Sequence, residues 1–198
     1  MTGVQTCALP TCDPETGDGA GVLIQIPHKF FARETARLGF TLPPEGHYGV
    51  GMVFMPVERH ERLITEGVVE RVIAREGLTF LGWRDTPLDV DAIGRVARAS
   101  QPYIQQVFVG RPGNLSQDDF ERKLYIVRKS LETAVAAEKE LPNRGMFYIP
   151  SLSSRTIIYK GLLLAPQGIG AAVAMRWSGR LTDRIGGAPV VLAGLLVL

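Results

Sequence analysis

The first stretch whose residue types and spacing could support chemistry is the glycine-rich segment 13–21, DPETGDGAG. It leads directly into an apolar run. Glycine loses more backbone freedom on folding than any other residue, so this density indicates a backbone that passes close to another group. The spacing of Gly17, Gly19 and Gly21 before a strand excludes a dinucleotide fingerprint, which follows a strand and opens a helix. A P-loop is excluded because no lysine followed by Ser or Thr accompanies these glycines. From residue types alone, a tight surface turn remains the alternative.

Thiols and imidazoles offer little further chemistry. Cys7 and Cys12 are the only cysteines, and with no further thiol and no clustered histidines they lack the ligands for a structural zinc site. They could form a disulfide or half of a metal site, but inert thiols are the favoured interpretation. His28, His47 and His60 share no spacing that would build a site. No metal is expected.

The polar stretch 150–155, PSLSSR, is expected as a turn between two strands. Ser153, Ser154 and Arg155 could support a bound substrate from this turn. The alternative is that the hydroxyls cap backbone groups of the turn itself.

The alternation of apolar runs with amphipathic segments predicts an α+β architecture in which sheets lie beneath one long helix. That helix begins at Ser116, whose hydroxyl can cap it, and Asp119 can return the bond. The expected strands are residues 22–26, 50–55, 78–83, 103–109, 146–149 and 156–160, and the expected helices are 28–38, 58–75 and 116–139.

Composition suits a globular protein of 198 residues, with 45% hydrophobic and 21% charged residues. A net charge of +2 gives no electrostatic footprint for nucleic acid, so none is expected as a partner. Arg84 and Asp85 are expected to form a solvated pair, and Arg111 an isolated surface charge. The average hides a boundary, because residues 162–198 are largely apolar and carry only the charges Arg176, Arg180, Asp183 and Arg184.

Six stretches in collinear order, between residues 12 and 165, closely resemble the amidotransferase region of the glutamate synthase large subunit. The resemblance implies an αββα sandwich of the N-terminal-nucleophile hydrolases, here in partial form. The stretches are DPETGDGAGVLIQIPHKFF, LPPEGHYGVGMVFMP, LTFLGWRDTP, ARASQPYIQQVFVGRP, FERKLYIVRKSLE and FYIPSLSSRTIIYKGLLLA.

The resemblance implies a glutaminase that supplies ammonia for transfer to 2-oxoglutarate. A cysteine at residue 1 of the processed chain attacks the amide of L-glutamine, with its own α-amino group as base, and forms a thioester. It implies a cytoplasmic protein with no cofactor in this region, because FMN and an iron–sulfur cluster belong to later domains. The implied pocket-lining residues are Thr16, Gly17, Asp18, Gly19 and Gly21, with Ser154 and Arg155 in support.

The beginning of the chain departs from the family pattern. Counted back from Thr16, the family's glutamine-binding arginine falls at Cys7, and no Cys-Gly start or His-Arg-Gly-Ala stretch is present. We expect residues 1–11 to be a non-native, adaptor-like leader. Neither cysteine is expected to replace the nucleophile, so the chain is predicted to be inactive.

The end of the chain departs as well. After residue 165 the family's glutamine-gripping and oxyanion segments do not follow, and G-x-x-x-D-R-x-G resembles a loop of major facilitator transporters. Residues 166–198 are therefore predicted as an apolar helical, transporter-like fragment that could bring the chain to a membrane, although its runs fall short of the about 20 residues of a span. The alternative function is a drug:proton antiporter fragment with a globular passenger. Both ends are expected to pack poorly, and the family's small subunit is not expected to bind. The motif residues are Gly179, Asp183, Arg184 and Gly186.

Overall fold

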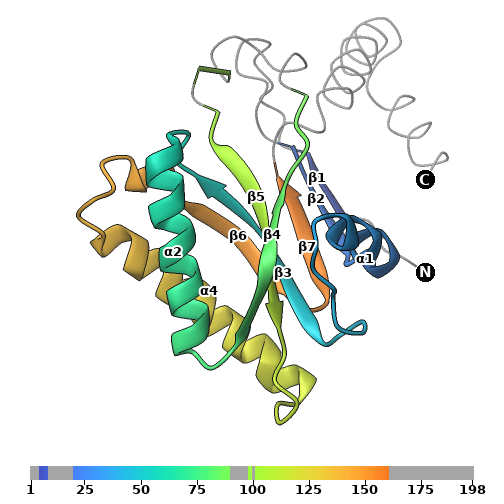
Figure 1. Cartoon of the computed structure of the whole chain (residues 1–198). Helices are drawn as coiled ribbons and strands as arrows, with labels where there is room; N and C mark the ends of the chain where they lie inside the picture. Colours follow the sequence, from blue (N-terminus) through green and yellow to red (C-terminus); the bar gives the residue numbers. More distant parts are fainter. Residues whose placement is uncertain (1–4, 9–19, 90–97, 100, 161–198) are drawn as a thin grey trace, which may run out of the picture.

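The computed structural model describes residues 5–8, 20–89, 98–99 and 101–160 (Figure 1). Within the glycine-rich segment, Thr16 to Gly19 lie outside the described residues. The transporter-like motif residues Gly179, Asp183, Arg184 and Gly186 do so too, as do most of the predicted leader and the whole of the predicted tail.

The described part is a mixed helix and sheet structure with two antiparallel sheets. The smaller sheet has the order β1 (Gln5–Ala8), β2 (Ala20–Gln25), β7 (Thr156–Lys160). The larger sheet has the order β4 (Thr79–Asp85), β5 (Tyr103–Gly110), β3 (Tyr48–Met55), β6 (Tyr148–Ser153). The helices are α1 (His28–Arg37), α2 (Arg59–Arg75) and α4 (Gln117–Ala137), with a 3₁₀ turn, η2 (Arg144–Met146).

The predicted strands and helices between residues 20 and 160 are confirmed, with ends displaced by a few residues. Two corrections arise. Strand β1 was not predicted, because it carries no apolar run and gains its order from pairing with β2. The predicted turn 150–155 is shorter than expected, since β6 continues through Ser153 and leaves only Ser154 and Arg155 between the strands.

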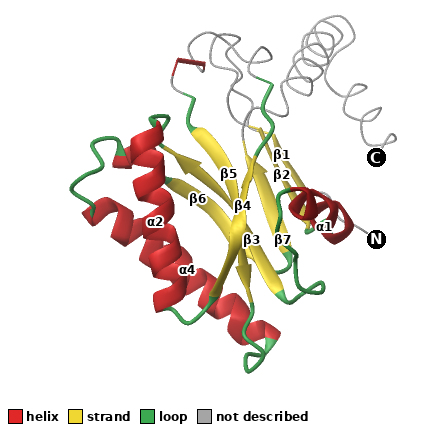
Figure 2. Ribbon diagram, viewed as in Figure 1, coloured by secondary structure: helices red, strands yellow, loops and turns green. Residues whose placement is uncertain are grey.

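The larger core lies between one face of the four-stranded sheet and the helices α2 and α4, which cover that face together (Figure 2). Val53 and Val107 point from the sheet into this core and meet Val69 and Leu124 of the helices. Alternation is lost along β3 and β5, whose residues are almost continuously buried, because both faces of the sheet are covered.

The second core lies on the opposite face of the same sheet. Tyr48, Val50 and Phe108 project there and pack with Phe31 of α1 and Ile157 of β7. The rings of Phe31 and Phe108 meet edge to face with centroids 5.2 Å apart, and both side chains are fully buried. Such burial stabilises by about 1.5–3 kcal/mol per side chain, so this cluster anchors α1 and the smaller sheet to the larger one.

The expectation for the surface charges was wrong. Arg84 is 7% exposed, because it faces the second core, where its guanidinium donates to Gln106 and approaches Glu34 of α1. Arg111 is not isolated either, since its guanidinium contacts the ring nitrogens of His47 at 2.9 Å. Both errors have one cause: strand pairing and helix packing bring partners that sequence proximity does not indicate.

Candidate functional site

The strand that receives the glycine-rich segment is the central strand of the smaller sheet. Gly21 pairs with Cys7 of β1 on one side and with Lys160 of β7 on the other. The position at which the resemblance expects the glutamine-binding arginine, Cys7, thus lies beside Gly21 across the backbone ladder. Ala20 and Gly21, the described end of the glycine-rich segment, therefore enter the sheet at this end of β2.

The serine turn lies elsewhere. Gln25, at the far end of β2, pairs with Thr156, and the amide of Ile26 donates to the carbonyl of Arg155 at 3.1 Å. Gln25 lies four residues beyond Gly21 on β2, which separates the two positions by about 14 Å at the rise of an antiparallel strand. The structure therefore does not bring Ser154 and Arg155 to the end of β2 at which Gly21 lies.

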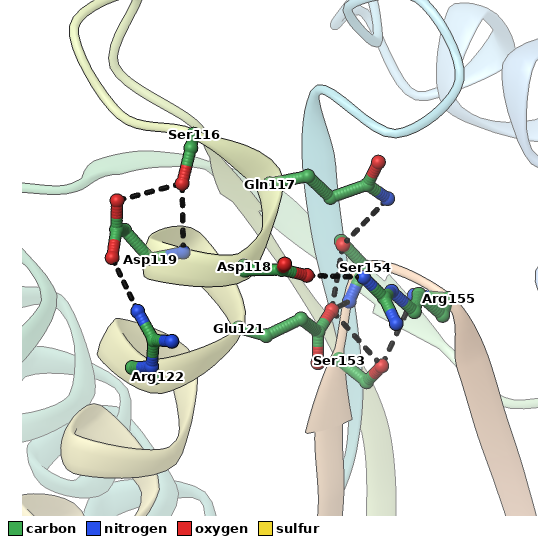
Figure 3. Close-up of polar contacts among 9 residues, drawn as sticks. All are labelled: Ser116, Gln117, Asp118, Asp119, Glu121, Arg122, Ser153, Ser154 and Arg155. Carbon is green, nitrogen blue, oxygen red and sulfur yellow. Dashed lines mark hydrogen bonds and ion pairs between the residues drawn. The ribbon is translucent and has the colours of Figure 1, made fainter.

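Ser154 is held by Glu121 of α4, as Figure 3 shows. Glu121 Oε1 accepts from the Ser154 amide at 2.5 Å, from Ser154 Oγ at 2.6 Å and from Ser153 Oγ at 3.2 Å. Ser154 is only 5% exposed, so these bonds satisfy polar groups that the fold largely buries. The serine hydroxyls are thus engaged within the fold, as turn hydroxyls that stabilise the β6–β7 connection.

The N-terminus of α4 completes this cluster (Figure 3). Ser116 Oγ caps the helix by accepting from the Asp119 amide at 3.1 Å, as predicted, and donates to Asp119 Oδ2 at 2.6 Å. The bond from the Ser116 hydroxyl, together with Arg122, holds the pKa of Asp119 below its usual value. Arg155 reaches across to Asp118 at 2.5 Å, so an ion pair also joins the turn to the helix.

A pocket of about 210 Å³ opens beside the serine turn. Burial, followed by the nearby charge of Glu45, raises the pKa of Tyr48 in its wall far above the usual range. The Tyr48 hydroxyl lies 3.3 Å from His28 Nδ1, where α1 begins. The pocket is smaller than ordinary small-molecule sites, and several of its polar side chains already bond to other parts of the fold, Ser154 to Glu121 and Arg155 to Asp118. Its lining residues are Gln25, Ile26, Glu45, Gly46, Tyr48, Gln117, Ser154 and Arg155.

A second polar cluster, not found from the sequence, lies where α2 meets the ends of β4 and β5. Gln105 is 7% exposed, and its Nε2 donates to Asp85 Oδ1 at 2.8 Å, while its Oε1 has no partner among the described residues. Burial raises the pKa of Glu66, and burial together with a hydrogen bond to Asp85 raises the pKa of Tyr103. Arg62 stacks 3.8 Å from the centre of the Tyr103 ring. The sequence feature that could have indicated this cluster is the pair Gln105 and Gln106 in an otherwise apolar strand.

In the part of the chain that the structure describes, no group of three or more His, Cys, Asp or Glu side chains is arranged to hold a metal ion. None of the helices in that part has both the length and the apolar composition needed to cross a membrane.

The described part is therefore an α+β domain with two packed antiparallel sheets, whose smaller sheet receives a glycine-rich segment. The family model of the class-II glutamine amidotransferases matches residues 7–170. The chain belongs to this family.

Individual relatives narrow the likeness to one kind of enzyme. The chain is 46% identical over 157 residues to the glutamate synthase [NADPH] large chain of Bacillus subtilis, covering 78% of this chain and 10% of that protein. It is 43% identical over 157 residues to the ferredoxin-dependent glutamate synthase 1, chloroplastic/mitochondrial, of Arabidopsis thaliana, covering 76% and 9%. The chain therefore spans about a tenth of the length of the curated relatives it matches.

Proposed function

We propose that the chain is part of the glutaminase region of a glutamate synthase and that L-glutamine is its substrate. The match of the class-II amidotransferase family to residues 7–170 carries the proposal, because it includes β2, in which Gly21 lies, and every described helix. The relatives from Bacillus and Arabidopsis support the same assignment, since both are named as glutamate synthases.

In this proposal, the segment from Thr16 to Gly21 lines the glutamine pocket. At its three glycines the backbone can approach the substrate closely and present amide N–H groups to it. A cysteine thiolate attacks the carboxamide carbon, the C–N bond breaks, ammonia leaves with a proton from the α-ammonium group, and water then hydrolyses the thioester. We assign the nucleophile to neither Cys7 nor Cys12, since Ala8 and Asp13 stand where the family has glycine.

Several finer parts of the proposal rest on sequence resemblance. The two-sheet arrangement is proposed to be a partial αββα sandwich of the N-terminal-nucleophile type, and FMN and the iron–sulfur cluster are proposed to belong to domains beyond this region. An adaptor-like origin for residues 1–11 and a transporter-like origin for residues 166–198 rest on their motifs alone. No observation on the described residues favours an antiporter function, and we do not propose one.

A segment exchange tests the function. Residues 12–165 replace the matching segment of the Bacillus relative, which retains its own beginning and later domains, and glutamate formation is measured with L-glutamine or with an ammonium salt as nitrogen donor. We expect activity with both donors. Activity with ammonium alone would contradict the proposal, because it would show that the synthase part works while the exchanged segment does not support glutamine hydrolysis.

A further inference from the structure

Arg84 joins three elements at a buried position between the larger sheet and α1. From β4, its Nη1 donates to Gln106 Oε1 of β5 at 2.9 Å, and its Nη2 lies 3.5 Å from Glu34 Oε2 of α1. The guanidinium also lies 5.2 Å from the ring centre of Phe30 on α1. One side chain therefore ties α1 to two strands of the larger sheet.

Stability alone does not explain this arrangement. Burial of a guanidinium is costly, and apolar residues of similar volume are often as stable as a buried ion pair, or more stable. Gln106 is fully buried, so the site places two polar side chains where the rest of the second core is apolar. An arginine adds a fixed orientation between the elements that it joins, because the N–H donors of its planar guanidinium bond only in a fixed geometry.

The location of Arg84 links this orientation to the smaller sheet. α1 follows β2 with only Ile26 and Pro27 between them. Contacts that restrain the position of α1 therefore also restrain the position of β2. The second core brings β2 to the same face of the larger sheet, because Ile24 of β2 and Phe30 of α1 both pack against this core.

We propose that Arg84 is a positioning residue: through Glu34 and Phe30 it orients α1, and thereby sets the place of β2, which begins with Ala20 and Gly21 of the glycine-rich segment. The link to glutamine rests on the proposed function. The positioning itself does not, because it concerns only the described contacts among β4, β5, α1 and β2.

Hydrogen exchange on the full 198-residue chain tests the positioning. In Arg84→Gln we expect the amides of β2 and α1 to exchange about tenfold faster, as for the loss of a charge-assisted hydrogen bond, while those of β3 keep their rates. Arg84→Lys, which keeps the charge but not the fork, should show a smaller increase. Arg122→Gln is the matched control, because it removes an exposed arginine–aspartate pair on α4. A uniform acceleration in all strands, or unchanged rates in β2 and α1, would overturn the proposal.

A second experiment uses the exchanged Bacillus enzyme and measures its kinetics with glutamine and with ammonium. There, Arg84→Gln should raise KM for glutamine about tenfold, with kcat for the ammonium reaction unchanged and partial rescue by Arg84→Lys. A fall in both reactions together would show a general structural role and contradict the proposal. The unsubstituted exchange enzyme reports separately on the proposed function, so the two failures are distinguishable. Phe30→Leu, which removes the ring beneath the guanidinium together with its contact to Phe31, leaves the polar bonds of Arg84 in place and should shift KM in the same direction.

Discussion

At the scale of single residues, Glu66 shows how burial alters an ordinary carboxyl group. Burial raises its pKa, as do the charges of Glu70 and Asp85, whereas the hydrogen bond from Gln105 and the charge of Arg62 lower it. A raised pKa means that the folded protein binds the proton more tightly than the unfolded chain. The associated stability is fully present below the unfolded value of about 4.3 and is lost as pH rises through the folded pKa.

Glu66→Gln removes this titration. We expect a higher melting temperature at pH 7 than in the wild type and a flatter dependence of stability on pH above about pH 4. Thermal unfolding followed by circular dichroism between pH 4 and 8 measures both. Glu140→Gln, which neutralises an exposed carboxylate, is the control and should leave the pH profile close to that of the wild type. A lower melting temperature of Glu66→Gln at pH 7 would show that the attraction of Glu66 to the charge of Arg62 stabilises the fold more than the burial of the carboxylate destabilises it.

Ser154 offers a second test at the same scale. Its hydroxyl donates to Glu121 at 2.6 Å from a side chain that is only 5% exposed, so Ser154→Ala removes one of the hydrogen bonds that this carboxylate accepts. We expect a loss of about 1.5–3 kcal/mol in the free energy of unfolding, measured by urea denaturation. Ser130→Ala, which removes a longer contact of 3.4 Å to Glu76, should cost less. Equal losses in the two variants would mean that the serine turn is not a specific stabilising contact.

At the scale of elements, the fit of β3 against β6 depends on a residue without a side chain. A Cβ added at Gly51 would lie 2.9 Å from the carbonyl oxygen of Ser151 and 3.0 Å from a methyl of Leu152. The backbone of a paired strand cannot move aside easily, so Gly51→Ala should destabilise by about 1–3 kcal/mol. Urea denaturation measures the change. Gly113→Ala is the control, since its Cβ would meet no atom within 4 Å, and a similar loss there would argue against steric conflict as the cause.

At the scale of the whole molecule, the chemistry implied by the family needs a cysteine whose α-amino group is free to act as base. Neither cysteine of this sequence is followed by the glycine that the family pattern has after its nucleophile, because Ala8 follows Cys7 and Asp13 follows Cys12. We therefore expect the purified polypeptide to release ammonia from glutamine no faster than buffer, and alkylation of its thiols to change nothing. A coupled ammonia assay measures this. Glutamine-dependent release that alkylation abolishes would show that one of these cysteines is a nucleophile.

The elements themselves could be predicted because their signals are local. Apolar runs closed by proline or glycine marked β2 and β3, and the cap at Ser116 with helical spacing after it marked α4. Collinear stretches were enough to predict the family that the comparisons confirm. Strand β1 escaped because four residues without an apolar pattern become a strand only when β2 lies beside them.

By itself, then, the sequence determined the order of the helices and strands between residues 20 and 160 and the family to which the chain belongs, since both depend on the order of residues along the chain. Only the tertiary structure decided which side chains meet. It buried Arg84 against Glu34 and Gln106, which lie 50 and 22 positions away, and it put Ser154 at the opposite end of β2 from Gly21. The physical reason is that strand pairing and helix packing set these distances, and both depend on contacts between residues remote in the chain.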